Sequence, residues 1–442
     1  MKFGSLSIIA ASIALSACVT TGGGITPDKL TRPIRADDKP YIGEKDEAHS
    51  KTSWITPAHK MKQNVQWDVE VARSGRFTKD GAVSLFVAPH ASPFVYSKND
   101  PLIKTGHAQT ESVESMLKNS AYLDPYSIWK LDADNKPTEL LIDLGRGCRQ
   151  SHRALVEDFN QDGIDDVFVV CTGAALDNIP DSELWGGIGA DEKNRIVLSD
   201  GKGGFTNTEV GEKGMYHGGS AADINGDGYP DVVVANMLNN NTVSVFFYIN
   251  QKDGTFKKDT SRIVGGLPNH GYQSVVLVDV DGDGIVDLVV GTGISTTYAT
   301  PVTQAQVLFG DADGKFGRER MTIPSVPGRG VILDIETVTN NGERILYVYR
   351  TSDATSGLPC CFRGAYASET MQAVNLTTGK TSIVFDKMKE MNRTPVGTFY
   401  STTPVTERGW MPVTRNGQKG IAPANELREE LTVIDGKLVG AK

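Results

Sequence analysis

A short aspartate-rich motif occurs three times in the middle of this chain, and it constrains the fold more than any other feature. The motif has the form D-x-[DN]-x-D-G-x-x-D. It begins at Asp158, Asp223 and Asp279 and is followed each time by a short, mostly β-branched run. Self-similarity at a regular period is typical of stacked or radially arranged units. The sequence therefore predicts a repeat architecture in which a unit contains one acidic loop and the strand after it.

The spacing of oxygen-bearing residues in the motif suits a calcium ion. Ca²⁺ takes about six to eight oxygen ligands, which positions 1, 3, 5, 7 and 9 supply when the chain curls around the ion. The glycine at position 6 permits the positive φ of a sharp turn. Carboxylates crowded into one loop repel each other unless a cation lies among them. About three structural Ca²⁺ ions are expected, with these ligands: Asp158, Asn160, Asp162, Ile164 and Asp166; Asp223, Asn225, Asp227, Tyr229 and Asp231; and Asp279, Asp281, Asp283, Ile285 and Asp287, where position 7 contributes its carbonyl.

An EF-hand begins in the same way, but it needs a bidentate Glu at position 12 and a helix on each side of the loop. Position 12 is Val169, Val234 or Val290, and the flanking segments are β-branched runs typical of buried strands. A strand, an acidic loop and a second strand in this order resemble FG-GAP repeats, also called VCBS or integrin-α-like repeats. The resemblance covers about residues 150–320.

This resemblance implies an all-β fold, a β-propeller of six or seven four-stranded blades with aspartate-rich calcium loops. Hairpins between third and fourth strands are expected at Asp200–Phe205, Asp253–Phe256 and Asp313–Phe316. Weaker copies at 133–136, 377–380 and 435–437 bring the number of blades to six, and 73–77 would supply a seventh blade or closing strands.

Two segments depart from this pattern. Residues 331–386 are predicted to form a blade that has lost its calcium loop, because Asp334-Ile335-Glu336 is not followed by D-G-x-x-D. Residues 107–121 are predicted to form a short helix inserted in the first blade.

The N-terminus is predicted to be an export signal. Lys2 precedes a mostly apolar, uncharged run at 3–15, which is shorter than the about 20 residues that span a bilayer. Small residues then precede Cys18, which resembles a bacterial lipobox whose cysteine is lipidated, although an ordinary cleavage site with a chance cysteine is the alternative. Several acyl chains on one residue would give stable membrane anchoring.

We therefore expect a signal peptide at 1–17, the lipidated cysteine and a flexible linker at 18–60, and the propeller at 61–442. Val19 follows the lipidated cysteine, and resemblance to proteobacterial lipoproteins implies the outer membrane, with the protein facing the periplasm or the cell surface.

Four further cysteines would enter an oxidising compartment after export. They allow three pairings, and free buried thiols are the alternative. The favoured pairs are Cys148 with Cys171 and Cys360 with Cys361.

Polar and aromatic residues near the innermost strands are expected to share one face of the propeller. Such a mixture suits sugars or anionic groups. The alternative is that each side chain satisfies backbone groups at the ends of the blades. The candidate ligand-binding residues are His152, Arg153, His217, Asn236, His270, Tyr272 and Arg329.

The function expected from these features is recognition at the cell envelope. A net charge of −9 argues against a nucleic-acid partner. No G-x-S-x-G elbow, P-loop, H-E-x-x-H or kinase signature is present, so no catalytic residue is predicted. We expect a membrane-anchored calcium-binding propeller that binds a glycan or a protein partner. The alternatives are a propeller-scaffold enzyme acting on polysaccharide and a structural subunit of an envelope complex.

Overall fold

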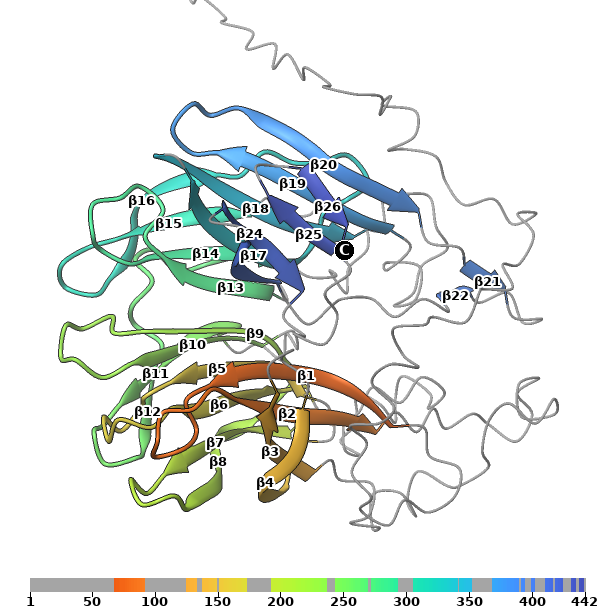
Figure 1. The fold of residues 1–442 in the computed structure, drawn as a ribbon. Coiled ribbons are helices and arrows are strands. Elements are labelled where there is room, and N and C mark those ends of the chain that lie inside the picture. The colour runs from red at the N-terminus through yellow and green to blue at the C-terminus, as the bar shows by residue number, and fades with distance from the viewer. Residues whose placement is uncertain are drawn as a thin grey trace, which may run out of the picture.

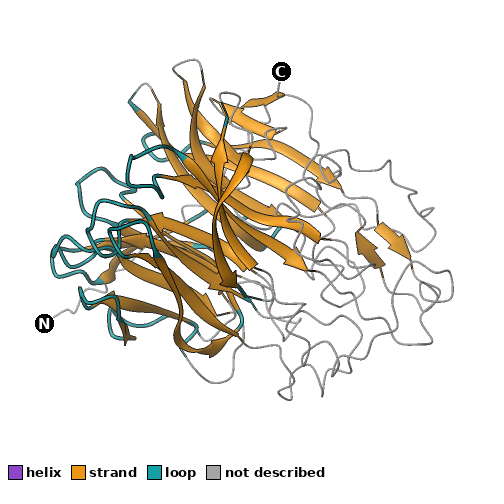
Figure 2. Ribbon diagram, turned by 60° about the horizontal axis from the view of Figure 1, so that its bottom comes forward, coloured by secondary structure: helices purple, strands orange, loops and turns teal. Residues whose placement is uncertain are grey.

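The computed structural model describes the chain in segments, and every regular element in them is a β-strand (Figure 2). No helix in these segments is long and apolar enough to cross a bilayer. The described residues are 67–91, 125–132, 137–148, 151–172, 192–236, 243–268, 272–292, 305–340, 342–351, 368–388, 391–393, 399–401, 410–415, 418–423, 431–434 and 437–440. The features expected at 1–17, 18–60, Cys18, 107–121, 133–136, His270, Cys360 and Cys361 lie outside the described residues.

The strands form four-stranded antiparallel sheets, each built from four consecutive strands (Figure 1). The first sheet contains β1 (Trp67–Gly75), β2 (Ser84–Ala91), β3 (Pro125–Leu131) and β4 (Pro137–Arg146). The second contains β5 (Ser151–Glu157), β6 (Asp166–Cys171), β7 (Glu192–Ser199) and β8 (Phe205–Gly214). The third contains β9 (Tyr216–Ala222), β10 (Asp231–Asn236), β11 (Val245–Asn250) and β12 (Phe256–Asp259).

The same pattern continues towards the C-terminus. The fourth sheet contains β13 (Tyr272–Val278), β14 (Asp287–Thr292), β15 (Gln306–Gly310) and β16 (Phe316–Thr322). The fifth contains β17 (Val331–Asn340), β18 (Glu343–Thr351), β19 (Ser368–Asn375) and β20 (Thr381–Met388). A small sheet pairs β21 (Met391–Arg393) with β22 (Phe399–Ser401), and a last four-stranded sheet contains β23 (Trp410–Arg415), β24 (Gln418–Pro423), β25 (Leu431–Ile434) and β26 (Lys437–Gly440).

The first strands of successive sheets lie next to one another. β5 lies between β1 and β9, β13 lies between β9 and β17, and β17 also contacts β23 and β24. Gly218 allows the close approach of β9 to β13, because a Cβ there would lie 2.8 Å from the carbonyl oxygen of Gln273. Among the described strands, the last sheet makes no comparable contact with the first, so these sheets do not form a closed ring. The arrangement is consistent with a β-propeller-like fold.

The hydrophobic core lies between successive sheets. On β10, Val232 and Val234 pack with Phe168 of the second sheet, whereas Val233 packs with Val275 of the fourth sheet. Because successive strand residues point to opposite faces, β10 is buried on both sides. This explains the continuous apolar runs that follow the acidic loops, and it confirms that these runs are buried strands.

A disulfide connects two of the sheets, and short hairpins connect strands within them. A disulfide joins Cys148, just after β4, to Cys171 at the end of β6, with Cα atoms 5.7 Å apart, so it ties the first sheet to the second. The hairpins expected at 200–205, 253–256 and 313–316 lie between the third and fourth strands of their sheets. Residues 73–77 fall at the end of β1 and therefore belong to the first sheet. Residues 331–386 contribute β17 to β20, a sheet whose first two strands join by a short turn in place of an acidic loop.

Candidate calcium-binding loops and the predicted ligand face

Each acidic loop joins the first and second strands of a sheet. The loops lie between β5 and β6, β9 and β10, and β13 and β14 (Figure 1). Strand pairing reaches the edges of each loop, because Glu157 pairs with Asp166 in the second sheet and Ala222 pairs with Asp231 in the third. The described loops gather along one side of the molecule (Figure 2). The loops are therefore held at fixed places by the strands on either side.

The backbone of each loop wraps around the carboxylates at positions 1 and 5. Asp158 accepts hydrogen bonds from the N–H groups of Asp162 at 3.1 Å and Gly163 at 2.9 Å. Asp162 accepts one from the N–H group of Ile164 at 2.9 Å. The glycine at position 6 has a φ of 87°, 88° and 87° in the three loops, in the left-handed region that glycine adopts without strain. A closely similar pattern holds Asp223 and Asp227 in the second loop and Asp279 and Asp283 in the third.

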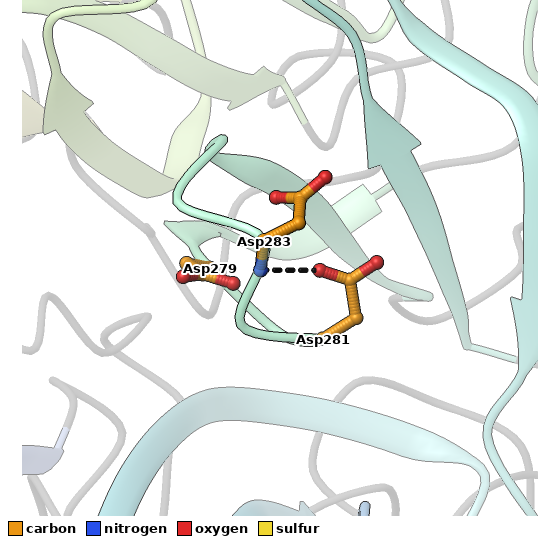
Figure 3. A group of neighbouring side chains, drawn as sticks. All are labelled: Asp279, Asp281 and Asp283. Atoms are coloured by element: carbon orange, nitrogen blue, oxygen red, sulfur yellow. Dashed lines mark hydrogen bonds between the residues drawn. The ribbon is translucent and has the colours of Figure 1, made fainter.

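The third loop brings three carboxylates together. Asp279, Asp281 and Asp283 each offer an oxygen atom within 4.8 Å of the others, so this triad could hold a metal ion (Figure 3). In the other loops position 3 is an asparagine. The side-chain amide of Asn160 donates to Asp162 at 3.2 Å, and that of Asn225 donates to Asp227 at 3.1 Å. All three loops thus place side chains from positions 1, 3 and 5 close together, and hard oxygen donors of this kind suit Ca²⁺.

The aspartate at position 9 has a structural role that the sequence analysis missed. Asp166 is buried, and its carboxylate accepts hydrogen bonds from the N–H groups of Phe159 at 2.9 Å and Ser199 at 2.7 Å. Phe159 is at position 2 of the loop and Ser199 ends the third strand, so this aspartate fixes the loop to the sheet. Asp231 and Asp287 are buried in the same way and make the corresponding contacts. Their roles as metal ligands stay predictions.

Burial is also the largest influence on the acidity of these anchoring carboxyls. It raises the pKa of Asp166 to about 7 and that of Asp231 to about 6, although backbone N–H donors lower both pKa values in part. The pKa of Asp287 is raised for the same reason. The position 9 aspartate had a detectable sequence signal, because it is always the first residue of the strand that follows the loop.

The acidic loops also contact the sheet that follows. The side-chain amide of Asn250, at the end of β11, donates to the carbonyl oxygen of Phe159 in the first loop at 2.8 Å. Arg344 on β18 donates to the carbonyl oxygen of Val280 in the third loop at 2.8 Å. Loop conformation and packing between sheets are therefore linked.

Two histidines of the predicted ligand face stack on one another. The rings of His152 on β5 and His217 on β9 lie 4.3 Å apart with an angle of 24° between their planes, and both side chains are buried. Burial lowers the pKa of His217 to about 3, so its imidazole is neutral. A metal ligand lone pair lies in the plane of its imidazole ring. Rings stacked this closely cannot both direct a lone pair at the same ion, so their geometry does not favour a shared metal.

Arg153 on β5 forms a long-range ion pair with β17. Its guanidinium lies 2.6 Å from Asp334 and 2.9 Å from Glu336, which links the second sheet to the fifth. The remnant of the lost acidic loop is thus part of a regular strand and binds an arginine. Burial and the neighbouring Asp334 raise the pKa of Glu336, while Arg153 lowers it in part. Two neighbouring carboxylates repel each other when both are ionised, so their closeness favours the protonated form of one of them.

The other described members of the predicted ligand face also make internal contacts. Arg329 is only 1% exposed and donates to Asp386 at 3.0 Å. The Tyr272 hydroxyl donates to the carbonyl oxygen of Pro268 at 3.3 Å. Asn236 is buried, and its side-chain oxygen accepts a hydrogen bond from the N–H group of Met215 at 3.3 Å. Ligand binding by these residues stays a prediction.

A known protein family matches the segment of the chain that contains these loops. Residues 158–234 and 223–290 match the model described as an FG-GAP-like repeat, and the matches begin at the first aspartates of the first and second acidic loops. The middle of this chain contains FG-GAP-like repeats. No curated protein matches the sequence.

Two solved structures resemble the fold at low identity. A candidate 6-phosphogluconolactonase from Bacteroides uniformis is 11% identical, with a TM-score of 0.41, and the match covers 82% of this chain and 84% of that one. A rhamnogalacturonan lyase from Bacillus licheniformis is 16% identical, with a TM-score of 0.38, over 86% of this chain and 57% of the lyase. This chain therefore spans a little over half the length of the lyase. At these TM-scores neither similarity carries an argument about fold or function.

Replacement of the anchoring aspartate of the second loop tests its structural role. Asp231→Ala leaves the buried N–H groups of Asn250 and Ile224 without their carboxylate, and each such loss costs about 1–3 kcal/mol. We expect a fall of at least about 2 kcal/mol in the free energy of unfolding, measured in urea with EDTA present. Asp313→Ala, on an exposed hairpin, is the control and should change stability by less than about 0.5 kcal/mol. Equal effects of the two substitutions would contradict the anchoring role.

The pH dependence of stability tests the cluster of Arg153, Asp334 and Glu336. The native pKa of Glu336 is raised, so the native state binds more protons than the unfolded chain between the two pKa values. Stability should therefore fall as pH rises above the ordinary glutamate value of 4.5. Glu336→Gln removes this contribution, so the variant should lose less stability than the wild type between about pH 5 and pH 8. Parallel pH profiles from urea unfolding would show that Glu336 titrates normally.

Proposed function

We propose that this chain is a calcium-binding β-propeller that recognises a glycan or a protein partner at the bacterial cell envelope. The observation that carries the proposal is the threefold recurrence of one loop geometry. In each loop the backbone wraps around carboxylates at positions 1 and 5, and the FG-GAP-like match covers all three. Ca²⁺ would be held by the side chains at positions 1, 3 and 5, the carbonyl at position 7 and the aspartate at position 9. Its role would be structural, because a bound ion neutralises the crowded carboxylates.

The proposed propeller has six or seven blades, and six four-stranded sheets supply most of it. The Arg153 ion pair supports a ring, because it joins β5 of the second sheet to β17 of the fifth without passing through the sheets between them. In a six-bladed ring the second and fifth blades would face each other across the axis. Closure would bring the last sheet to the first.

Recognition is favoured over catalysis because the acidic side chains that contact the predicted ligand face are already bound to one of its arginines. The carboxylate pair of Asp334 and Glu336 is the feature that favours the alternative of an enzyme acting on polysaccharide, because a raised pKa suits a general acid. Both carboxylates, however, are bound to Arg153 and are largely buried. A structural subunit of an envelope complex is the other alternative, and it would need a large exposed apolar patch.

The proposed location is the outer membrane, with the propeller facing the periplasm or the cell surface. It rests on the sequence around Cys18, where small residues precede the cysteine and Val19 follows it. Lipidation of Cys18 would tether the propeller through the linker at 18–60, which leaves the blades exposed to partners.

Calcium dependence of stability tests the metal sites. Ca²⁺ that binds only the folded chain stabilises it by about 2.7 kcal/mol per site at a hundredfold excess over the dissociation constant. We expect the melting temperature of the full chain to rise with added Ca²⁺ and to fall in EDTA. Asp227→Ala should reduce this difference, whereas Asp313→Ala should preserve it. A melting curve that EDTA leaves unchanged would show that the loops are not structural calcium sites.

A glycan array tests the recognition function. The full chain, in mild detergent, is screened once with Ca²⁺ and once with EDTA. A calcium-dependent signal on one class of glycan is the expected result, and substitutions at the described ligand-face residues His217 and Tyr272 would then locate the binding surface. Glycan binding that is the same in EDTA would contradict a calcium-organised binding face, and a blank array would favour a protein partner.

A further inference from the structure

The third acidic loop has a cation from its own chain beside it. The guanidinium of Arg344, on β18 of the fifth sheet, lies 3.8 Å from the carboxylate of Asp279 and donates to the carbonyl oxygen of Val280 at 2.8 Å. It also covers Gly282, because a Cβ at that position would lie 2.1 Å from the guanidinium. The Arg344 side chain is 24% exposed, so this cation is held against the loop from a neighbouring sheet.

The third loop also carries more negative charge at its centre than the other two. Positions 1, 3 and 5 are Asp279, Asp281 and Asp283, whereas the other loops have an asparagine at position 3. Asn160 and Asn225 each donate a side-chain N–H to the carboxylate at position 5. Asp281 has no such donor, so repulsion among the three carboxylates must be offset in another way.

We propose that Arg344 is a built-in counter-ion of the third loop, which lowers the calcium affinity of this loop and preserves its shape when calcium is scarce. The proposal rests on the calcium-binding function proposed above. A guanidinium stays charged at all physiological pH values. It therefore offsets the repulsion of the aspartates in the calcium-free protein and repels Ca²⁺ that approaches the same carboxylates.

The cation near the second loop is more exposed to solvent than Arg344. Lys252 lies 3.4 Å from Asp227, but its side chain is 47% exposed, and solvent screens exposed pairs of this type. Arg344, in contrast, is fixed by a hydrogen bond to the loop backbone and belongs to the next sheet. Filling of the third site is therefore linked to the contact between the fourth and fifth sheets.

A calcium titration of the full chain tests the affinity part of the proposal. Native mass spectrometry in mild detergent counts the bound ions at each free calcium concentration. The wild type should bind three ions. Arg344→Gln should lower the calcium concentration at which one of these ions binds about tenfold, because one like charge is removed. Arg318→Gln is the matched control, because Arg318 pairs with Asp311 and Asp313 on a hairpin and with none of the carboxylates at positions 1, 3 and 5 of the described loops.

The melting temperature separates a counter-ion from an ordinary structural contact. In EDTA, Arg344→Gln should melt below both the wild type and Arg318→Gln, because the carboxylates lose the partner cation that β18 supplies. In saturating Ca²⁺ this deficit should shrink, because the bound ion replaces the lost charge.

Three results would overturn the proposal, and they also separate it from the calcium-binding function. A calcium titration that Arg344→Gln leaves unchanged or shifts to higher concentration overturns the role of Arg344 alone. An equal deficit in melting temperature with and without Ca²⁺ does the same. Wild-type protein that binds no calcium overturns both the role of Arg344 and the proposed calcium-binding function.

Discussion

A buried aspartate at the start of the second strand is the contact on which each acidic loop depends. Asp166, Asp231 and Asp287 each accept at least one hydrogen bond from the loop backbone and one from the end of the third strand. One side chain therefore joins three elements of a sheet, and the carboxylates at positions 1 and 5 are oriented as a result. Because a buried carboxylate without these donors is strongly destabilising, the geometry of the loop and the integrity of the sheet are linked.

The acidic loops and the packing of the sheets are also linked. The first loop accepts a hydrogen bond from the third sheet through Asn250, and the third loop accepts one from the fifth sheet through Arg344. Arg153 adds a contact of longer range between the second and fifth sheets. An ion bound in a loop would thus stabilise more than its own turn, and this offers a physical reason for placing several metal sites in one repeat protein.

Much of the fold follows from local sequence patterns. The all-β class, the buried strands after the loops and the hairpin at Asp200–Phe205 were predictable, because alternating or β-branched runs and Asp/Gly turns act over a few residues. The glycine at position 6 also adopts the expected positive φ. These features depend on neighbours in the sequence, so a single chain is sufficient to find them.

The contacts that were missed join residues far apart in the sequence. Arg153 and Asp334 are separated by 181 positions, and the fragment Asp334-Ile335-Glu336 was interpreted only as the remnant of a lost loop. The stacking of His152 on His217 depends on how two sheets approach one another. No local sequence pattern specifies which distant residues meet. The sequence therefore did not show that members of the predicted ligand face pack against each other inside the protein.

We propose that the three acidic loops hold calcium, and anomalous diffraction from crystals grown with Ca²⁺ is a direct test of this proposal. We expect a peak within each loop, surrounded by the side chains at positions 1, 3 and 5. Crystals of the folded protein in saturating Ca²⁺ without peaks in the loops would contradict it.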